Sequence, residues 1–319
     1  METNASIYVA GHTGLVGSAL VRNLHARGYT RIVTKSRAEL DLTQQAHVEA
    51  FFRAERPAYV FLAAARVGGI RANAIYPAEF IQTNLAIQNN VIHAAHQFGA
   101  KRLLFFGSSC AYPKYAPQPM QEASLLTGPL EPTSEPYAMA KLAGISMCAA
   151  YNRQYGTRFI SAIPATVYGP GDNFDLEAGH VLPALLRRFE AAKRGLSSES
   201  EGVAIWGTGA ARREFLFVDD LVSACLMLMS LPEKQVDEVL REPVVNIGAG
   251  ADITIHDLAH LIGRVVGYSG RIIFDATKPD GAPRKQLDTA ALGRLGWHSM
   301  TSLEKGIQIT YAWYQSIFQ

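Results

Sequence analysis

Short apolar runs rich in β-branched and aromatic residues alternate with stretches of helical periodicity through the first half of this 319-residue chain. The runs predict strands over residues 6–10, 31–34, 58–62, 102–106 and 158–163, and the longer stretches predict helices over 15–27, 44–55, 77–98 and 135–155. The runs are apolar on both faces, as is typical of central strands in a parallel sheet. Strands that alternate with helices imply right-handed crossovers, so the pattern predicts an α/β protein with a doubly wound parallel sheet.

The pattern changes after about residue 164, where loops become longer and richer in glycine and proline. Helices are predicted near 180–194, 218–230, 254–266 and 301–317, and the stretch 195–202 reads as a polar loop. Two segments, "FLFVDDLVSACLMLM" and "PVVNIG", look like elements of the sheet. We therefore expect a sheet domain of residues 1–164 plus about 214–247, and a smaller α/β lobe of about 165–213 plus 248–319.

Composition narrows the classes of partner. The chain is 48% hydrophobic and 18% charged with a net charge of +2, which gives no electrostatic reason to expect nucleic acid or an anionic membrane as a partner. No apolar run approaches the roughly 18 residues of a membrane span. Cys110, Cys148 and Cys225 are too few and too scattered for a disulfide framework or a zinc site. We expect a cytoplasmic protein without a metal.

The stretch "VAGHTGLVGSALVRNL" joins the first predicted strand to the first helix. Gly11, Gly14 and Gly17 in this position allow a tight turn, a close approach of backbone to a pyrophosphate, and close packing of helix on sheet. The helix begins with Leu15 and Val16, where free N–H groups can bind phosphate. The spacing predicts a dinucleotide site of the Rossmann type.

The end of the second strand indicates which dinucleotide is bound. Sites for NAD usually carry an acidic residue there, whereas this chain has Lys35 and Arg37. Two cations suit a 2′-phosphate, which favours NADP(H), and Asp41 and Leu42 would then lie beside the adenine. The alternative is a solvated basic loop that leaves the choice of cofactor open.

Tyr137 and Lys141 are four residues apart on a predicted helix and so share one face. At about 5 Å and an effective dielectric constant of about 20, the ammonium would favour a phenolate by about 3 kcal/mol. This predicts a pKa of Tyr137 more than two units below its usual value of about 10. Ser108, at the end of the fourth strand, can hydrogen-bond the same carbonyl oxygen. The set indicates a site in which tyrosine moves a proton while a nicotinamide moves hydride.

These residues give the chain a clear resemblance to the extended short-chain dehydrogenase/reductases. Within them it is most similar to the GDP-L-fucose synthase family, through stretches such as "AAARVGGI", "LLFFGSSCAYPK", "EPYAMAK", "HVLPALLRRF" and "REFLFVDD". The resemblance runs nearly end to end. It implies an NADPH-dependent enzyme that epimerises C3 and C5 of GDP-4-keto-6-deoxy-mannose and then reduces the C4 ketone.

Epimerisation requires a base and an acid beside the ketone, in addition to the residues that serve hydride transfer. The resemblance assigns these roles to Cys110, two residues beyond Ser108, and to His180, which opens a helix and also lies at the cofactor. Without the resemblance, a cysteine at a strand end reads as inert filling and a histidine at a helix start as a cap or surface group. Cys148 and Cys225 read as core residues.

The resemblance also implies further binding residues. For the cofactor these are Thr13, Ala63, Ala64, Ala65, Lys141, Pro164 and Val167, and for the nucleotide sugar they are Arg188, Trp206, Arg213 and Asp280. Arginines suit a diphosphate, and a tryptophan offers a flat surface to sugar or base. Some relatives have a basic residue in place of Thr13, so binding of the 2′-phosphate would depend here on Arg37 and Lys35.

Family members pair through two long helices, so we expect a homodimer that uses the helices near 77–98 and 135–155. Two other functions stay open at this point. The first is a related nucleotide-sugar 4-epimerase or 4-reductase that lacks chemistry at C3 and C5. The second is a non-catalytic protein that senses the dinucleotide, although such a protein has no need of the tyrosine, lysine and serine.

Overall fold

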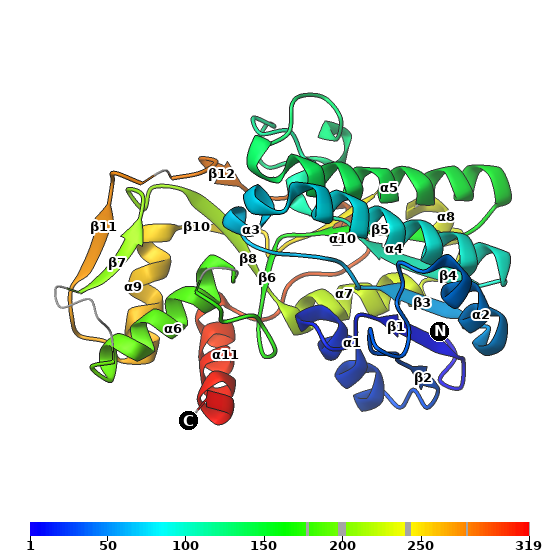
Figure 1. Ribbon diagram of the computed structural model, residues 1–319, viewed down its shortest axis with the longest axis horizontal. Coiled ribbons are helices and arrows are strands. Elements are labelled where there is room, and N and C mark those ends of the chain that lie inside the picture. Colours follow the sequence, from blue (N-terminus) through cyan, green and yellow to red (C-terminus); the bar gives the residue numbers. More distant parts are fainter. Residues whose placement is uncertain (177–178, 197–201, 240–243, 279, 319) are drawn as a thin grey trace.

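The computed structural model describes residues 1–176, 179–196, 202–239, 244–278 and 280–318. These residues form a larger part built on a parallel sheet and a smaller lobe that extends from one end of it (Figure 1). Most of the predicted polar loop, residues 197–201, lies outside the described residues. The domain boundaries proposed above remain a prediction.

The central sheet has six parallel strands in the order β2-β1-β3-β4-β5-β9. They are β1 (Ile7–Ala10), β2 (Ile32–Val33), β3 (Tyr59–Leu62), β4 (Arg102–Phe106), β5 (Phe159–Pro164) and β9 (Val245–Ile247). The five strands predicted in the first half of the chain are confirmed, and "PVVNIG" supplies the sixth. The strand order reverses between β1 and β3, which is where doubly wound sheets bind ligands at their carboxyl edge.

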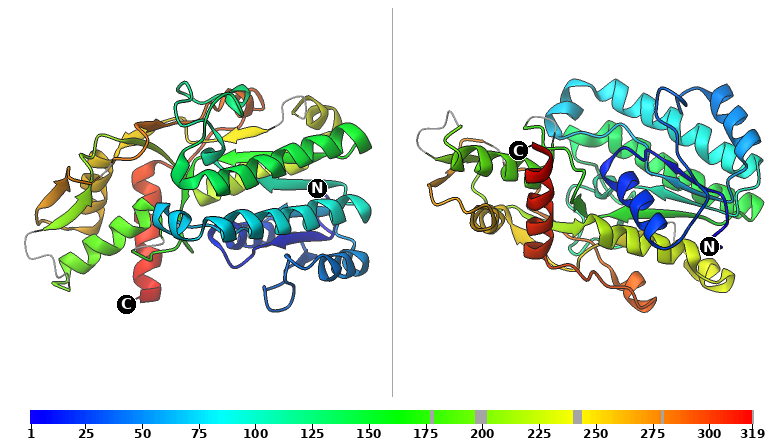
Figure 2. Two further views of the ribbon diagram at one scale, coloured as in Figure 1. Left: turned by 45° about the horizontal axis from the view of Figure 1, so that its top comes forward. Right: turned by 90° about the horizontal axis from the view of Figure 1, so that it is seen from below.

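Helices cover both faces of this sheet, as two further views show (Figure 2). The helices α1 (Leu15–Ala26) and α7 (Val218–Ser230) pack together on one face, and α2 (Gln45–Glu55), α4 (Pro77–Gln97) and α5 (Glu135–Tyr155) on the other. The long helices α4 and α5 run side by side and make the most extensive helix–helix packing. None of the described helices is both long enough and apolar enough to cross a membrane.

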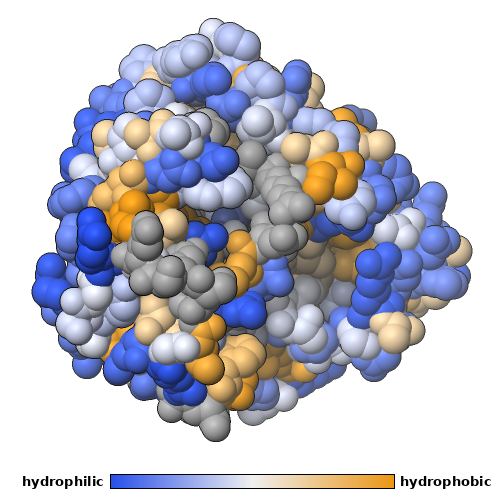
Figure 3. Space-filling model, turned by 60° about the vertical axis from the view of Figure 1, so that its left-hand side comes forward, coloured by the Kyte–Doolittle hydropathy of each residue, from blue (hydrophilic) through white to orange (hydrophobic). Residues whose placement is uncertain are grey.

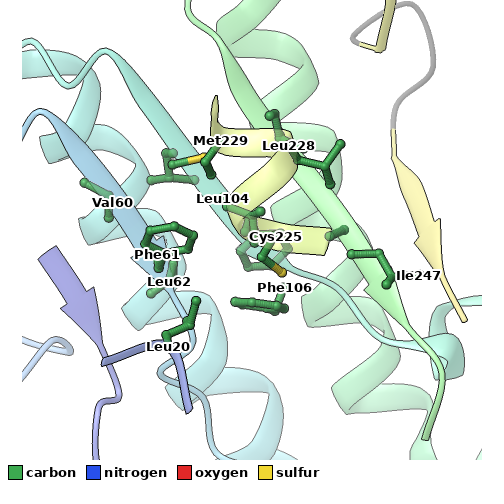
Figure 4. Packing of buried hydrophobic residues seen from close by; sticks show 14 of the residues in the cluster. Leu20, Val60, Phe61, Leu62, Leu104, Phe106, Cys225, Leu228, Met229 and Ile247 are labelled. Carbon is green, nitrogen blue, oxygen red and sulfur yellow. The ribbon is translucent and has the colours of Figure 1, made fainter. Parts of the chain in front are cut away.

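The core of the larger part lies between the sheet and these helices. Figure 4 shows Phe61, Leu104, Phe106 and Met229 from strands and helix meeting in one packed layer. Cys225 is fully buried in the same layer, and Cys148 on α5 is 1% exposed. Both cysteines are therefore core residues, as predicted.

The smaller lobe has its own apolar cluster, centred on Leu186, Phe189, Leu258 and Ile307. Its helices are α6 (Val181–Lys193), α9 (Ile255–Val266) and α11 (Leu303–Phe318). Strand β8 (Arg212–Phe217) pairs with β6 (Thr166–Tyr168), β10 (Asp252–Thr254) and β12 (Arg284–Lys285), while β7 (Val203–Trp206) pairs with β11 (Ile272–Asp275). Figure 3 views the molecule with the smaller lobe turned toward the reader, and there apolar residues lie among hydrophilic ones on the surface.

The sequence did not predict several short elements. They are α3 (Ile70–Ile75), α8 (Glu233–Val239), α10 (Ala290–Arg294), the strands β6, β7, β10, β11 and β12, and three 3-10 turns. Each is too short for a clear apolar period, and each forms because tertiary neighbours supply its hydrogen bonds or its buried face. The long helices, which have such a period, and the central strands, which are continuous apolar runs, were predicted within a few residues of their observed ends.

Candidate active site

A shallow hollow lined by Glu2, Arg31, Arg56 and Lys101 opens at the amino ends of strands β1, β3 and β4. Ligands of open parallel sheets bind instead beyond the carboxyl ends of the strands. All the residues singled out from the sequence of the sheet domain follow those carboxyl ends. We therefore place the candidate site at that edge, where the smaller lobe begins.

Two glycines of the turn after β1, Gly11 and Gly17, leave no room for a side chain. Gly11 has φ +85°, and a Cβ added to it would lie 2.6 Å from the backbone nitrogen of Ala64. A Cβ on Gly17 would lie 2.0 Å from the carbonyl oxygen of Gly11. Gly14 precedes α1, which starts at Leu15 and Val16 without a side-chain cap. The free N–H groups at the start of α1 and the bare backbone fit a dinucleotide pyrophosphate.

The two cations after β2 differ in their surroundings. Lys35 lies 3.6 Å from Glu39 in an ion pair, whereas Arg37 is exposed and no ion pair holds it within the described parts of the chain. Arg37 lies near Asp41, whose pKa is lowered mainly by hydrogen bonds from Thr43 and in smaller part by this guanidinium. Arg37 is therefore the better placed of the two to bind a 2′-phosphate.

The loop after β3, which begins with Ala63, Ala64 and Ala65, is held by a buried amide. Asn84 on α4 accepts a hydrogen bond from the Arg66 backbone N–H at 3.0 Å and donates one to the Arg66 carbonyl at 3.0 Å. On the same helix, Asn90 donates to the carbonyl of Leu42 at 2.9 Å. One helix thus fixes both loops that would flank an adenine nucleotide.

Ser108, Tyr137 and Lys141 come together at the end of β4. Helix α5 starts at Glu135, after Ser134 and with Pro136 in its first turn, and so brings Tyr137 and Lys141 to the strand end. The Tyr137 and Ser108 hydroxyls interact directly. The Lys141 Nζ is buried, donates to the carbonyl of Phe106 at 2.8 Å, and lies 5.8 Å from the centroid of the Tyr137 ring.

The predicted low pKa of Tyr137 is wrong for this structure. Burial raises the pKa of Tyr137 above its usual value, a nearby Cys110 charge raises it further, and only the Ser108 hydrogen bond opposes this. Burial also lowers the pKa of Lys141 to about 8. The reason is that desolvation disfavours both charged forms, while the ammonium is directed to a backbone carbonyl. Tyr137 is therefore protonated at neutral pH, the form that can give a proton to a carbonyl oxygen.

Cys110 lies in the 3-10 turn Ser109–Ala111 directly after β4, and its backbone N–H donates to the Ser108 hydroxyl at 3.2 Å. Its sulfur lies 4.0 Å from the Lys285 Nζ, and Arg213 is close enough for a mutual electrostatic effect. Arg213 and Lys285 are register partners on β8 and β12. The pairing of β8 with β12 therefore brings two positive charges to the thiol.

His180 is the residue before α6, so its position at a helix start is confirmed. Part of the residue is open to solvent, yet the surrounding protein desolvates its imidazole and lowers the pKa below its usual value. The imidazole is then mainly neutral at neutral pH. A neutral imidazole is able to accept a proton.

Pro164 and Val167 also lie at this edge of the sheet. Pro164 is the last residue of β5, and its partner in the register of β9 is Ile247. Val167 lies in β6, two residues after the strand break at Ala165. This places the "PATVYGP" backbone at the junction between the sheet and the lobe.

The residues expected to bind a nucleotide sugar lie on the lobe. Trp206 is 63% exposed at the end of β7, with the Lys278 ammonium 5.9 Å above its ring. Asp280 accepts hydrogen bonds from the Thr208 backbone and hydroxyl at 2.7 and 2.8 Å and acts electrostatically on Arg213. Arg188 on α6 donates to the Ala204 carbonyl of β7 at 2.9 Å. An indole this exposed is available to a planar ligand.

Three residues of this region were not singled out from the sequence. Lys285 contacts Cys110, Asn84 holds the loop after β3, and Glu214 accepts a hydrogen bond from the backbone N–H of Leu287, two residues after Lys285. Glu214 stands in the stretch "REFLFVDD", which carried the resemblance, and Lys285 lies about 70 residues further along the chain. Their roles depend on the pairing of β8 with β12. A strand of two residues, such as β12, is too short to be predicted from a sequence.

Comparison with known proteins agrees with this geometry. The "NAD dependent epimerase/dehydratase family" model matches residues 7–248. The chain is 54% identical to GDP-L-fucose synthase 1 of Arabidopsis thaliana over 98% of this chain and 94% of the relative. It is 50% identical to GDP-L-fucose synthase of Escherichia coli K12, over 97% of this chain and 96% of the relative.

A solved structure adds a second kind of relative. The GDP-mannoheptose C4 reductase MlghC of Campylobacter jejuni, with NADP bound, is 41% identical and superimposes with a TM-score of 0.89 over 99% of both chains. The match to the family model covers the glycine turn, the serine and cysteine after β4, and the tyrosine and lysine of α5. The chain belongs to the NAD dependent epimerase/dehydratase family.

Proposed function

We propose that this protein converts GDP-4-keto-6-deoxy-D-mannose into GDP-L-fucose, by inverting C3 and C5 and then reducing the C4 ketone with NADPH. The observation that carries the proposal is the thiol of Cys110 beside the hydroxyls of Ser108 and Tyr137, facing Arg213 and Lys285. A reductase needs the two hydroxyls, and the thiol adds the proton-transfer group that inversion requires. The extent of identity to two GDP-L-fucose synthases supports it.

The glycine turn fits the cofactor, because Gly11 and Gly17 leave room only for bare backbone. Arg37 would bind the 2′-phosphate, Asp41 and Leu42 would flank the adenine, and Lys141 would hold the nicotinamide ribose. We assign Thr13, Ala63, Ala64, Ala65, Pro164 and Val167 to the walls of the same site. When bound, NADPH supplies the hydride that reduces C4.

One oxygen serves both stages. A C4 ketone acidifies the protons at C3 and C5, because removal of either proton gives an enolate whose charge lies on the C4 oxygen. Ser108 and Tyr137 would donate hydrogen bonds to that oxygen and stabilise the enolate. In the reduction, Tyr137 transfers its proton to the same oxygen, and its raised pKa keeps the proton available until then.

Inversion takes a proton from one face of the carbon and returns a proton to the other. Cys110 and His180 would provide the two groups, one as acceptor and one as donor. The pair can start as thiolate and imidazolium or as thiol and neutral imidazole. The lowered pKa of His180 favours a neutral imidazole, which is able to act as the acceptor. In each inversion the acceptor takes a proton from one face of the carbon to give the enolate, and the donor gives a proton to the other face.

The nucleotide would lie along the lobe. Arg213 and Arg188 would bind the diphosphate, Trp206 would pack against the base or a ribose, and Asp280 would accept hydrogen bonds from the nucleoside. This assigns the lobe, with residues about 165–213 and 248–319, to substrate and the sheet domain to NADPH. Asp280 now bonds Thr208, so binding would exchange those hydrogen bonds for bonds to the ligand.

A second candidate is reduction of a GDP-4-keto sugar without inversion, which the likeness to a GDP-mannoheptose C4 reductase favours. We further propose a cytoplasmic homodimer in which α4 and α5 of two copies pack together. Met139 and Tyr155 on α5 are 45% and 51% exposed, which suits a covered surface.

The experiment is incubation with GDP-4-keto-6-deoxy-D-mannose and NADPH, with the product identified by NMR. We expect a sugar with the L-galacto configuration of fucose. A product inverted at neither C3 nor C5 would support the simple reductase instead, and no oxidation of NADPH would contradict both candidates.

A further inference from the structure

A buried carboxylate lies behind the cations of the site. Glu214, on β8 next to Arg213, is 2% exposed. Its two oxygens accept hydrogen bonds at 2.8 Å from the backbone N–H groups of Gly250 and Leu287, and Ala249 supplies a third. In the part of the chain that the structure describes, no basic side chain pairs with it. A buried carboxylate held only by backbone amides is costly to keep, and burial raises its pKa.

The three donors belong to segments that are distant in sequence. Ala249 and Gly250 follow β9, the last strand of the central sheet, whereas Leu287 follows β12 of the lobe by two residues. A Cβ on Gly248 would lie 2.4 Å from a Glu214 oxygen, so the loop after β9 is fitted closely around the carboxylate. Glu214 therefore joins three chain segments at the junction of sheet and lobe.

The same strands carry the cations. Side chains alternate between the faces of a strand, so Arg213 and Glu214 point to opposite faces of β8. Lys285 is the register partner of Arg213 on β12, and its Nζ is the group that contacts the Cys110 sulfur. β12 has only two residues, so its position against β8 depends on contacts of the residues around it. These contacts are the hydrogen bond from Leu287 to Glu214, the backbone hydrogen bonds of Gln286 and Asp288 with Met120, and the ion pair of Arg284 with Asp252.

We propose that Glu214 is a positioning residue that fixes β12 and the loop after β9 against β8, and so holds Lys285 and Arg213 beside Cys110. The inference rests on the proposed function, in which Cys110 takes part in inverting the sugar carbons. Its carboxylate does not touch the substrate. A small displacement of β12 moves the ammonium away from the thiol, and misplacement by about 1 Å can lower a rate by about 100-fold.

The test substitutes Glu214→Gln, which keeps the shape but turns an amide N–H₂ toward one of the backbone N–H donors. The matched control is Asp220→Asn, because Asp220 is also buried and accepts backbone hydrogen bonds, from Met300 and Thr301, away from the cations. For each folded variant, the melting temperature, the dissociation constant for NADPH and the rate of deuterium uptake at C3 and C5 from heavy water are measured. Gly248→Ala, which displaces the carboxylate sterically, is the second test variant.

We expect Glu214→Gln to slow deuterium uptake at least about tenfold, with the NADPH dissociation constant within about twofold of wild type. Asp220→Asn should lower the melting temperature without slowing deuterium uptake. If Glu214→Gln does not fold, Gly248→Ala takes its place in the test and should slow deuterium uptake to the same extent. Uptake within about threefold of wild type in a folded test variant, or equal slowing in the control, would overturn the inference. Absence of uptake in the wild type would instead overturn the proposed function itself.

Discussion

Tyr137 and Lys141 show how burial changes the meaning of a motif. The spacing of four residues places them on one face of α5, and the structure confirms that they meet at the end of β4. The charge relation expected from the spacing does not hold, because desolvation of both groups outweighs their attraction. Sequence spacing gives the distance between two groups, whereas the pKa values depend on surroundings that only the fold supplies.

The buried ammonium of Lys141 should make the stability of the protein depend on pH. The pKa of Lys141 is about 8 in the folded protein, below its usual value of 10.5, so the folded state loses this proton at lower pH than the unfolded state. Unfolding free energy should therefore rise by about 3 kcal/mol as pH increases from below 8 to above 10. Urea unfolding gives the free energy of unfolding of wild type and Lys141→Met at each pH. The difference between the two values should change by this amount across the range.

The control is Lys101→Met, whose ammonium is exposed. Its difference from wild type should change little with pH. A difference between wild type and Lys141→Met that stays constant across this range would contradict a depressed pKa of Lys141.

At the scale of elements, the glycine turn and the strands around it were the most predictable part of the site. Gly11 and Gly17 are required by close approaches of backbone, and that requirement appears in the sequence as glycine at fixed spacing. Cys110 followed from the resemblance, but its neighbour Lys285 did not, because β12 has two residues and its register partners on β8 are 72 residues away in the sequence. Chemistry carried by long periodic elements is predictable, and chemistry carried by short paired strands is much less so.

The segment after β2 gives the second prediction. Arg37 has no ion-pair partner among the described residues, while Lys35 is paired with Glu39, so Arg37 should supply most of the binding of the 2′-phosphate. We expect Arg37→Ala to weaken NADPH binding by about tenfold, in line with loss of a charge-assisted hydrogen bond, and to leave NADH binding within about twofold. Fluorescence titration with both dinucleotides measures this.

Arg53→Ala is a suitable control, because Arg53 is an exposed arginine on α2 whose guanidinium lies over the Phe98 ring. It should bind both dinucleotides as wild type does. Equal weakening of NADPH and NADH in Arg37→Ala would argue against contact with the 2′-phosphate.

At the scale of the whole molecule, two apolar clusters divide the chain between sheet and lobe, and the site residues come from both. This division was predictable, because the first half of the chain has regular apolar runs and the second half has long loops rich in glycine and proline. The exact boundaries do not follow, since residues such as Leu287 and Trp297 pack with the sheet cluster although they come late in the chain.

The proposed dimer gives the third prediction. Met139 lies on the outer part of α5 and is 45% exposed. Met139→Glu would place two charges in an apolar contact, so we expect the dissociation constant of the dimer to rise at least tenfold, measured by sedimentation velocity over a range of concentrations. Met300→Glu is the control, because Met300 is 87% exposed and its backbone bonds Asp220 of α7, which covers the other face of the sheet from α4 and α5. A wild-type protein that sediments as a monomer would contradict the proposed dimer.

Substitutions of Cys110 and Tyr137 can separate inversion of the sugar carbons from reduction of the ketone. Wild type, Cys110→Ser and Tyr137→Phe are each incubated with GDP-4-keto-6-deoxy-D-mannose in heavy water, and deuterium at C3 and C5 is followed by NMR before and after NADPH is added. We predict that Cys110→Ser loses deuterium uptake at least about 100-fold while NADPH can still reduce the ketone, and that Tyr137→Phe loses reduction by at least as much. Normal deuterium uptake in Cys110→Ser, or normal reduction in Tyr137→Phe, would contradict the account.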